Sequence, residues 1–224
     1  EFLRYNFGET LYELYFKPYN EKIWRQDLAK VPLSWLQGKL PMPKLNDIII
    51  NNIRGTKENV MVHSTFNYPN KNGSQFIANR LAQGLNIKYK SPVTDMRFDG
   101  SEWIINEAFR FDALIYTGNI KALTSTMRTC LSIEEMKSIE NLQSHGTTTV
   151  LCEIDSNDYS WMYLPSRNYE SHRIICTGNF AESNNDKGIR TGTIEFSEKL
   201  EKEDILYQLS QMPLNPKYID HNYQ

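Results

Sequence analysis

Long apolar runs and an excess of charge of one sign are both missing from this chain of 224 residues. No stretch reaches the roughly 18 apolar residues that a membrane-spanning helix needs, and the mean hydropathy is −0.56. The net charge is −2, and no basic stripe of the kind that binds nucleic acid is present. We therefore expect neither a membrane span nor a nucleic-acid partner.

Cysteine and histidine are scarce as well. The three cysteines, Cys130, Cys152 and Cys176, form no C-x-x-C pair. A sparse and odd cysteine count favours a reducing compartment over a disulfide framework, so we expect a cytoplasmic protein. The four histidines show neither H-E-x-x-H nor any Cys/His spacing, and we expect no metal site.

A complete catalytic motif is also lacking, because the chain has no G-x-G-x-x-G, no P-loop and no G-x-S-x-G. Two carboxylate pairs, Asp155 with Asp158 and Glu134 with Glu135, fit a solvated loop and a helix start better than acid/base catalysis. The catalytic residues are therefore unknown from the sequence.

What is present is the composition of a globular protein, 40% hydrophobic and 12% aromatic. The chain opens at Glu1 without a methionine or a signal peptide. It stops at Gln224 with neither a glycine C-cap nor a solvating tail. We expect an excised fragment of a longer protein.

The first half predicts several helices. Apolar residues recur at three- and four-residue spacing over residues 3–15, which predicts a helix. Pro18 predicts the end of this helix near Phe16 or Lys17. Residues 47–58 place Asn, Gly and Arg around a short apolar run, which predicts a loop or lid. Another helix is predicted after Ser74 as its N-cap.

The middle predicts three strands in succession. Residues 93–98 and 103–106 flank Asp99-Gly100, a strong hairpin signal. Residues 109–116 form the third predicted strand. Its apolar run at residues 113–115 predicts a buried centre.

Strands and helices alternate over the last hundred residues. The spacing of Ser132 and Glu135 predicts a helix opened by a capping box. Strands are predicted at residues 147–154, 161–164, 173–180 and 191–196, and a last helix at residues 205–212. The predicted fold class is α+β, with helices and a mixed or mostly antiparallel sheet.

Three segments in this order resemble a known group of flavoenzymes. The first, residues 7–24, reads F-G-E-T-L-Y-E-L-Y-F-K-P-Y-N-E-K-I-W, and the second, residues 66–82, reads F-N-Y-P-N-K-N-G-S-Q-F-I-A-N-R-L-A. The third joins S-P-V-T-D-M-R-F-D-G to F-D-A-L-I-Y-T-G. They resemble the superfamily of FAD-dependent amine oxidoreductases, protoporphyrinogen-oxidase-like proteins and UDP-galactopyranose mutases. The Rossmann unit that opens this family and its C-terminal flavin segment are not found in these 224 residues.

The resemblance implies the domain organisation. Residues 1–56 correspond to the first part of a substrate domain, residues 57–120 to a segment of the FAD domain, and residues 121–224 to the second part of the substrate domain. The implied partners are a small-molecule substrate and the missing parts of the same protein.

The resemblance also implies the cofactor, FAD, which we expect the full-length protein but not this fragment to hold. Val93 matches the residue whose backbone meets the adenine end of FAD. Thr117 and Gly118 match the strand end that approaches the cofactor.

Four residues match substrate positions of the family. Tyr19, Lys22 and Trp24 match an aromatic and basic motif beside the substrate cleft. Arg173 matches an arginine that faces the nucleotide diphosphate in the mutases, and a guanidinium suits phosphate because it pairs with two oxygens at once.

Three functions follow as hypotheses. The first is a fragment of an FAD-dependent mutase or oxidoreductase that acts on a nucleotide sugar, in the synthesis of lipopolysaccharide or another surface polysaccharide. The second is a protoporphyrinogen-oxidase-like amine oxidoreductase. The third is a flavin-free binding module that kept the fold.

Overall fold

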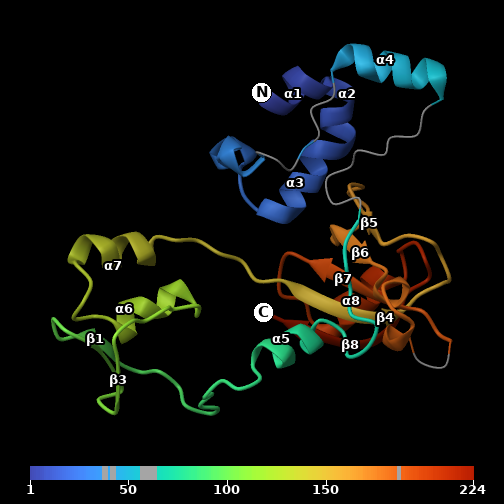
Figure 1. Ribbon diagram of the computed structural model, residues 1–224. Coiled ribbons are helices and arrows are strands. Elements are labelled where there is room, and N and C mark those ends of the chain that lie inside the picture. Colours follow the sequence, from blue (N-terminus) through green and yellow to red (C-terminus); the bar gives the residue numbers. More distant parts are fainter. Residues whose placement is uncertain (37–39, 41–43, 56–64, 186–187) are drawn as a thin grey trace. The chain divides into compact units, whose positions relative to one another are not determined.

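The structure is a computed structural model that describes residues 1–36, 40, 44–55, 65–185 and 188–224. These residues form two compact units (Figure 1), one of Glu1–Leu81 with His145–Gln224 and the other of Ala82–Ser144. Helices accompany two antiparallel sheets, which confirms the predicted α+β class. The functional division into residues 1–56, 57–120 and 121–224 stays a prediction.

The large unit begins with helices α1 (Phe2–Phe7), α2 (Glu9–Leu11) and α3 (Lys17–Trp24), with a π-helical segment, η1 (Tyr12–Phe16), before α3. The prediction that Pro18 ends the helix is wrong, because the chain stays helical to Trp24. Proline lacks an N–H and crowds the carbonyl four residues before it. The wider turn of the π-helical segment comes just before Pro18. Pro18 therefore lies in the first turn of α3, where a backbone N–H donor is not required.

Two 3-10 turns, η2 (Leu28–Lys30) and η3 (Leu33–Leu36), precede helix α4 (Leu45–Arg54). The loop predicted for residues 47–58 is therefore wrong over α4, and residues 56–58 lie outside the described residues. The helix ends at Gly55, whose φ of 59° gives a left-handed cap. The N–H of Gly55 donates to the backbone carbonyls of Asn51 and Asn52. The glycine thereby satisfies carbonyls that the end of the helix leaves without a partner.

Helix α5 (Gln75–Leu81) follows Ser74, as predicted. Its apolar side chains are solvent-accessible, with Phe76 46% and Leu81 72% exposed. None of the described helices is both long and apolar enough to cross a membrane.

A five-stranded antiparallel sheet in the order β5-β6-β7-β4-β8 forms the rest of the large unit. Its strands are β4 (Thr148–Glu153), β5 (Trp161–Tyr163), β6 (Arg173–Ile175), β7 (Thr191–Phe196) and β8 (Lys217–Tyr223). Strand β8 was not predicted. It pairs with β4 in a register that shifts between Leu151 and Cys152.

One face of this sheet carries the main core. Alternate residues of the central strands are fully buried there, namely Val150, Cys152, Ile174, Ile194 and Phe196. Ile205 and Leu209 of helix α8 (Lys202–Leu209) close the core from that side. Because side chains alternate along a strand, Arg173 and Glu195 project from the opposite face.

Strand β7 depends on a glycine. A Cβ at Gly192 would lie 2.8 Å from Ile154 Cδ1 and 2.9 Å from its Cγ2. These distances are shorter than a van der Waals contact, so the close packing of Ile154 on β7 requires a residue without a side chain at position 192.

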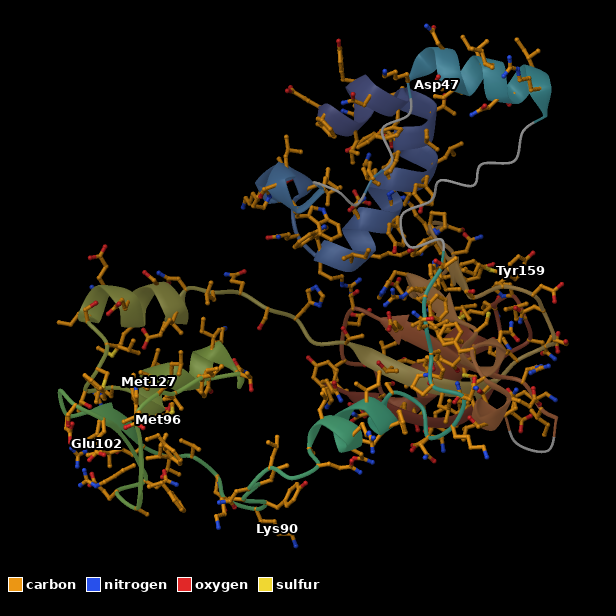
Figure 2. All side chains as sticks on the ribbon, viewed as in Figure 1. Asp47, Lys90, Met96, Glu102, Met127 and Tyr159 are labelled. Carbon is orange, nitrogen blue, oxygen red and sulfur yellow. The ribbon has the colours of Figure 1, made fainter. Side chains whose placement is uncertain are left out.

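The small unit contains the predicted meander of β1 (Met96–Phe98), β2 (Trp103–Ile105) and β3 (Phe109–Phe111). Met96, labelled in Figure 2, and Ile104 are each only 1% exposed and form its core. Short turns η4 (Ile120–Ala122) and α6 (Leu123–Thr126) lead to α7 (Ile133–Glu140). The predicted capping box is present, with Ser132 and Glu135 each bonded to the backbone of the other.

The buried strand predicted at residues 113–115 is wrong. Strand β3 ends at Phe111, and the side chain of Ile115 is 87% exposed. In the described part of the chain no strand pairs with residues 113–115. An apolar run becomes a buried strand only where neighbouring strands and helices cover it.

Candidate functional site

Helix α3 divides the predicted substrate residues between two of its faces. Tyr19 and Lys22 are three positions apart and share a face, whereas Trp24 is five positions from Tyr19 and lies on another. Tyr19 contacts Tyr163 of β5, and Lys22 contacts the segment that connects β5 to β6. Trp24 instead packs against Trp35. The structure therefore brings Tyr19 and Lys22 to the sheet and turns Trp24 away from it.

Three tyrosines form a cluster on this side of α3. Tyr15 stacks on Tyr19 with ring centroids 5.6 Å apart and planes 12° apart, and Tyr163 meets Tyr19 edge-on at 5.3 Å. Burial raises the pKa of Tyr19, the nearby Tyr163 and Tyr15 raise it further, and Arg173 opposes them. The Tyr19 hydroxyl is thus protonated at neutral pH and can donate a hydrogen bond.

Arg173 is the first residue of β6, and its charge acts on Tyr19 of the tyrosine cluster. It lies directly opposite Glu195 in the β6–β7 register. Its Nε and Nη2 donate to Glu195 Oε2 at 2.9 and 2.5 Å. The side chain of Arg173 is 36% exposed and that of Glu195 is 17% exposed, so the guanidinium borders solvent while the carboxylate lies beneath it.

His172 completes this charged group. Its Nε2 lies 3.3 Å from Glu195 Oε2, and its Nδ1 lies 3.3 Å from Ser197 Oγ. Its ring meets the Tyr19 ring edge-on, with centroids 6.5 Å apart. Burial raises the pKa of Glu195, but hydrogen bonds from His172 and Arg173 outweigh that effect and hold it below its ordinary value. Glu195 is therefore an anion at neutral pH.

Lys22 is held by backbone carbonyls. Its Nζ donates to the carbonyls of Leu164, Ser166 and Ser171 at 2.5, 2.6 and 3.0 Å. The residue is 8% exposed. Burial lowers the pKa of Lys22 to about 8, against the attraction of Glu170. Its three donors are engaged, so in this structure Lys22 fastens α3 to the β5–β6 connection.

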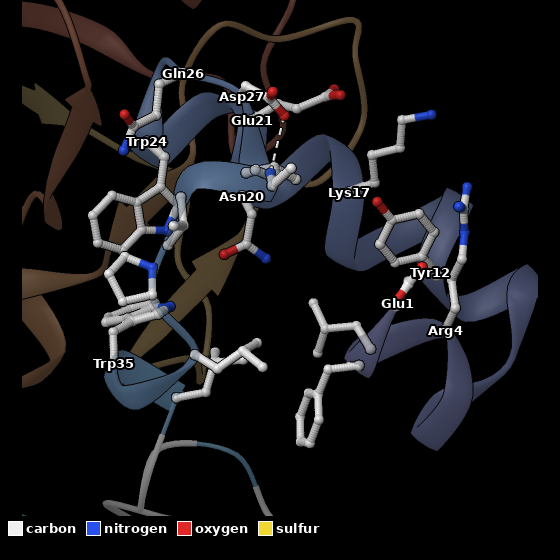
Figure 3. A pocket seen from close by; sticks show the side chains of 18 residues that line it. Glu1, Arg4, Tyr12, Lys17, Asn20, Glu21, Trp24, Gln26, Asp27 and Trp35 are labelled. Carbon is white, nitrogen blue, oxygen red and sulfur yellow. Dashed lines mark hydrogen bonds between the residues drawn. The ribbon is translucent and has the colours of Figure 1, made fainter.

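Trp24 lines a cavity of about 400 Å³ on the other side of α3 (Figure 3). Its ring meets that of Trp35 edge-on at 5.1 Å, and its buried Nε1 has no hydrogen-bond partner among the described residues. Asn20, 8% exposed, also lines the cavity and donates to the Phe16 carbonyl. The cavity offers flat aromatic walls, which suit a planar molecule.

The three predicted cofactor residues lie in the small unit. Val93 is 43% exposed, and Thr117 and Gly118 are exposed in an irregular segment after β3. The space over Gly118 is taken by Tyr116, since a Cβ at Gly118 would lie 2.7 Å from the Tyr116 hydroxyl oxygen. These residues alone do not enclose a cofactor.

No cluster of three or more histidine, cysteine or acidic residues is arranged to hold a metal in the parts of the chain that the structure describes. Cys152 is buried in the sheet, and burial raises the pKa of its thiol to about 12. That thiol is therefore unsuited to act as a thiolate nucleophile.

Glu195, His172 and Tyr163 were not predicted as site residues. The alternation of residues 191–196 places Glu195 opposite the core-facing Ile194, and this pattern is visible in the sequence. The pairing that sets Glu195 beside Arg173 depends on the β6–β7 register. No local sequence pattern reveals that register.

No protein-family model matches this chain. A crystal structure of reduced UDP-galactopyranose mutase matches 99% of this chain and 53% of that protein, with a TM-score of 0.81 and 15% identity. A protoporphyrinogen-oxidase-like protein from Exiguobacterium sp. 255-15 matches 100% of this chain and 53% of that protein, with a TM-score of 0.60 and 13% identity.

This chain spans about half the length of both proteins. At such low identity the likeness concerns the fold alone. It confirms that this chain shares the fold of UDP-galactopyranose mutase and of the protoporphyrinogen-oxidase-like protein.

Proposed function

We propose that this chain is the substrate-domain part of an FAD-dependent enzyme, joined to a piece of its FAD domain, and that the enzyme acts on a nucleotide sugar. The proposal is supported by the fold that the chain shares, over 99% of its length, with a UDP-galactopyranose mutase. Fold alone does not define a substrate, so the proposal depends on the site.

The observation that carries the proposal is the position of Arg173 near the Tyr19 cluster, where its charge affects the Tyr19 hydroxyl. A nucleotide sugar combines a flat base with a doubly charged diphosphate. Tyrosine rings can stack on the base, and a guanidinium can pair with phosphate oxygens. Other nucleoside diphosphate derivatives carry both chemistries too, so the sugar part of the proposal rests on the fold likeness.

The cofactor of the whole protein would be FAD, and the reduced flavin would supply the chemistry. Val93, Thr117 and Gly118 are the residues of this chain proposed to lie near it. Because they are exposed and do not form a closed site, we expect the 224-residue chain alone to bind FAD weakly at most. Surface polysaccharide synthesis in the cytoplasm is the proposed setting.

The second candidate function is that of a protoporphyrinogen-oxidase-like amine oxidoreductase. The cavity beside Trp24 and Trp35 favours it, because flat aromatic walls suit a planar apolar substrate. The fold likeness to the Exiguobacterium protein adds support, with a TM-score of 0.60.

The absorption spectrum of the full-length protein tests the proposed function, before and after addition of UDP-galactose. We expect the bands of bound flavin, and a shift of these bands when the sugar nucleotide occupies the site. A flavin spectrum that responds to a porphyrinogen but not to UDP-galactose would favour the second candidate. A colourless full-length protein would contradict both and support a flavin-free binding module.

A further inference from the structure

Glu195 holds Arg173 by one edge of its guanidinium. Both hydrogen bonds between them end on Glu195 Oε2, and they use only Nε and Nη2 of Arg173. Among the described residues, no side-chain hydrogen bond or ion pair involves Nη1. Since the Arg173 side chain is 36% exposed, that unused edge can meet a ligand that approaches from solvent.

Glu195 is itself fixed from two further sides. His172 Nε2 lies 3.3 Å from the same carboxylate oxygen, and His172 is 8% exposed. The backbone carbonyl of Glu195 accepts hydrogen bonds from the His172 N–H and from Ser171 Oγ. The carboxylate therefore occupies a rigid position from which it can orient a flexible arginine.

We propose that Glu195 is a positioning residue, which holds the guanidinium of Arg173 in the orientation that meets a phosphate group of the substrate. This inference rests on the proposed function, since it assumes a nucleotide diphosphate as ligand. Glu195 does not itself touch the substrate and acts through Arg173.

Arginine has many rotamers, and holding it in one conformation costs conformational entropy. If Glu195 fixes the guanidinium before the ligand arrives, this cost is already met and binding becomes tighter. The negative charge of Glu195 has the opposite effect on an anion. In this structure that charge is shared between two donors, Arg173 and His172, so the orienting effect is expected to dominate.

The test is a calorimetric titration of the full-length protein with UDP. In Glu195→Gln the side chain keeps its size but loses its charge and one acceptor oxygen. We expect UDP to bind about tenfold more weakly, the effect of losing roughly one charge-assisted hydrogen bond. Glu107→Gln is the matched control, because Glu107 accepts from Nε and Nη2 of Arg97 far along the sequence from the site. It should bind UDP as the wild type does.

A double-mutant cycle separates positioning from a merely structural role. If Glu195 acts through Arg173, then adding Glu195→Gln to Arg173→Ala should weaken UDP binding no further. If the losses of UDP affinity in the two single variants are fully additive in the double variant, Glu195 does not act through Arg173 and the inference is overturned.

Glu195→Asp keeps the charge and shortens the side chain, so it replaces Glu195→Gln if that variant does not fold. We expect an intermediate loss of affinity, and wild-type affinity in this variant would overturn the inference. A wild type that binds no UDP would overturn the proposed function together with this role. If the wild type binds UDP and Glu195→Gln binds it equally tightly or more tightly, the positioning role alone is overturned.

Discussion

The ammonium of Lys22 donates a 2.5 Å hydrogen bond to the backbone carbonyl of Leu164, which lies 142 residues further along the chain. The same ammonium bonds the carbonyls of Ser166 and Ser171. It thereby fastens helix α3 to the connection between β5 and β6. His172 and Arg173 follow Ser171 directly, so this contact helps to set the distance between the tyrosine cluster and the charged group.

Replacing Lys22 by Met should destabilise the protein. Three buried or half-buried carbonyls would lose their donor, and a hydrogen bond to a charged group contributes about 1.5–3 kcal/mol. We expect a loss of at least about 2 kcal/mol in the free energy of unfolding, measured by urea denaturation. Lys17→Met is the matched control on the same helix, because Lys17 pairs with a part-exposed Glu13 at 3.0 Å. A surface pair contributes about 0.3–0.5 kcal/mol, so equal losses in the two variants would refute the fastening role of Lys22.

The contribution of Lys22 to the free energy of unfolding should change with pH in alkaline solution. Burial lowers the pKa of Lys22 to about 8 from an ordinary value of 10.5. Between these values the unfolded chain binds more protons at this site than the folded chain, so stability rises with pH. The stability advantage of the wild type over Lys22→Met should therefore widen from pH 8 to pH 10. Denaturation curves at several pH values measure this, and an advantage that narrows over the same interval would contradict it.

The contribution of Glu195 to stability should change with pH in acid, and it should likewise rise with pH. Burial raises the pKa of Glu195, but His172 and Arg173 lower it below its ordinary 4.5. The stabilisation is then complete above 4.5 and is lost as the pH falls through the lower value in the folded protein. Melting curves of wild type and Glu195→Gln should differ at pH 7 and converge in acid. Curves that stay equally far apart at low pH would show that the difference does not come from this charge.

Gly192→Ala should destabilise the central sheet. The new Cβ would lie under 3 Å from Ile154, and overpacking a core costs about 1–3 kcal/mol. The combination with Ile154→Val removes the Cδ1 atom at 2.8 Å and should recover part of that loss. The denaturation midpoints of the wild type and the two variants measure this recovery. A Gly192→Ala protein as stable as the wild type would show that Ile154 moves aside freely.

Much of the fold could be predicted because its signals are local. The capping box of Ser132 and Glu135 and the turn at Asp99-Gly100 involve neighbours in sequence, so the surrounding protein hardly changes them. The strand at Thr191–Phe196 shows strict alternation of buried and half-buried residues. Such alternation can be read without knowing its partners.

The elements that were missed depend on context. Strand β8 is mostly exposed and polar, and it becomes a strand by pairing with β4. Pro18 interrupts a helix only where the preceding turn is a regular one, and here that turn is π-helical. The apolar run that ends at Ile115 reads as a buried strand, yet the described residues do not cover it.

The site was predictable only in part, for the same reason. Tyr19 and Arg173 were proposed from motifs, and the structure places both beside His172. Glu195 was missed because only the β6–β7 register brings it to Arg173. The motif that contains Lys22 and Trp24 did not reveal that these residues point in different directions from α3.

The most direct test of the proposed nucleotide-sugar site is a calorimetric titration of the full-length wild type and Arg173→Ala with UDP-galactose. We expect the wild type to bind UDP-galactose, and Arg173→Ala to bind it about ten- to a hundredfold more weakly, because a charge-assisted contact to phosphate is lost. Arg173→Lys should recover only part of the affinity, since an ammonium lacks the planar pair of donors. Equal affinity of wild type and Arg173→Ala for UDP-galactose would show that Arg173 does not bind the nucleotide sugar.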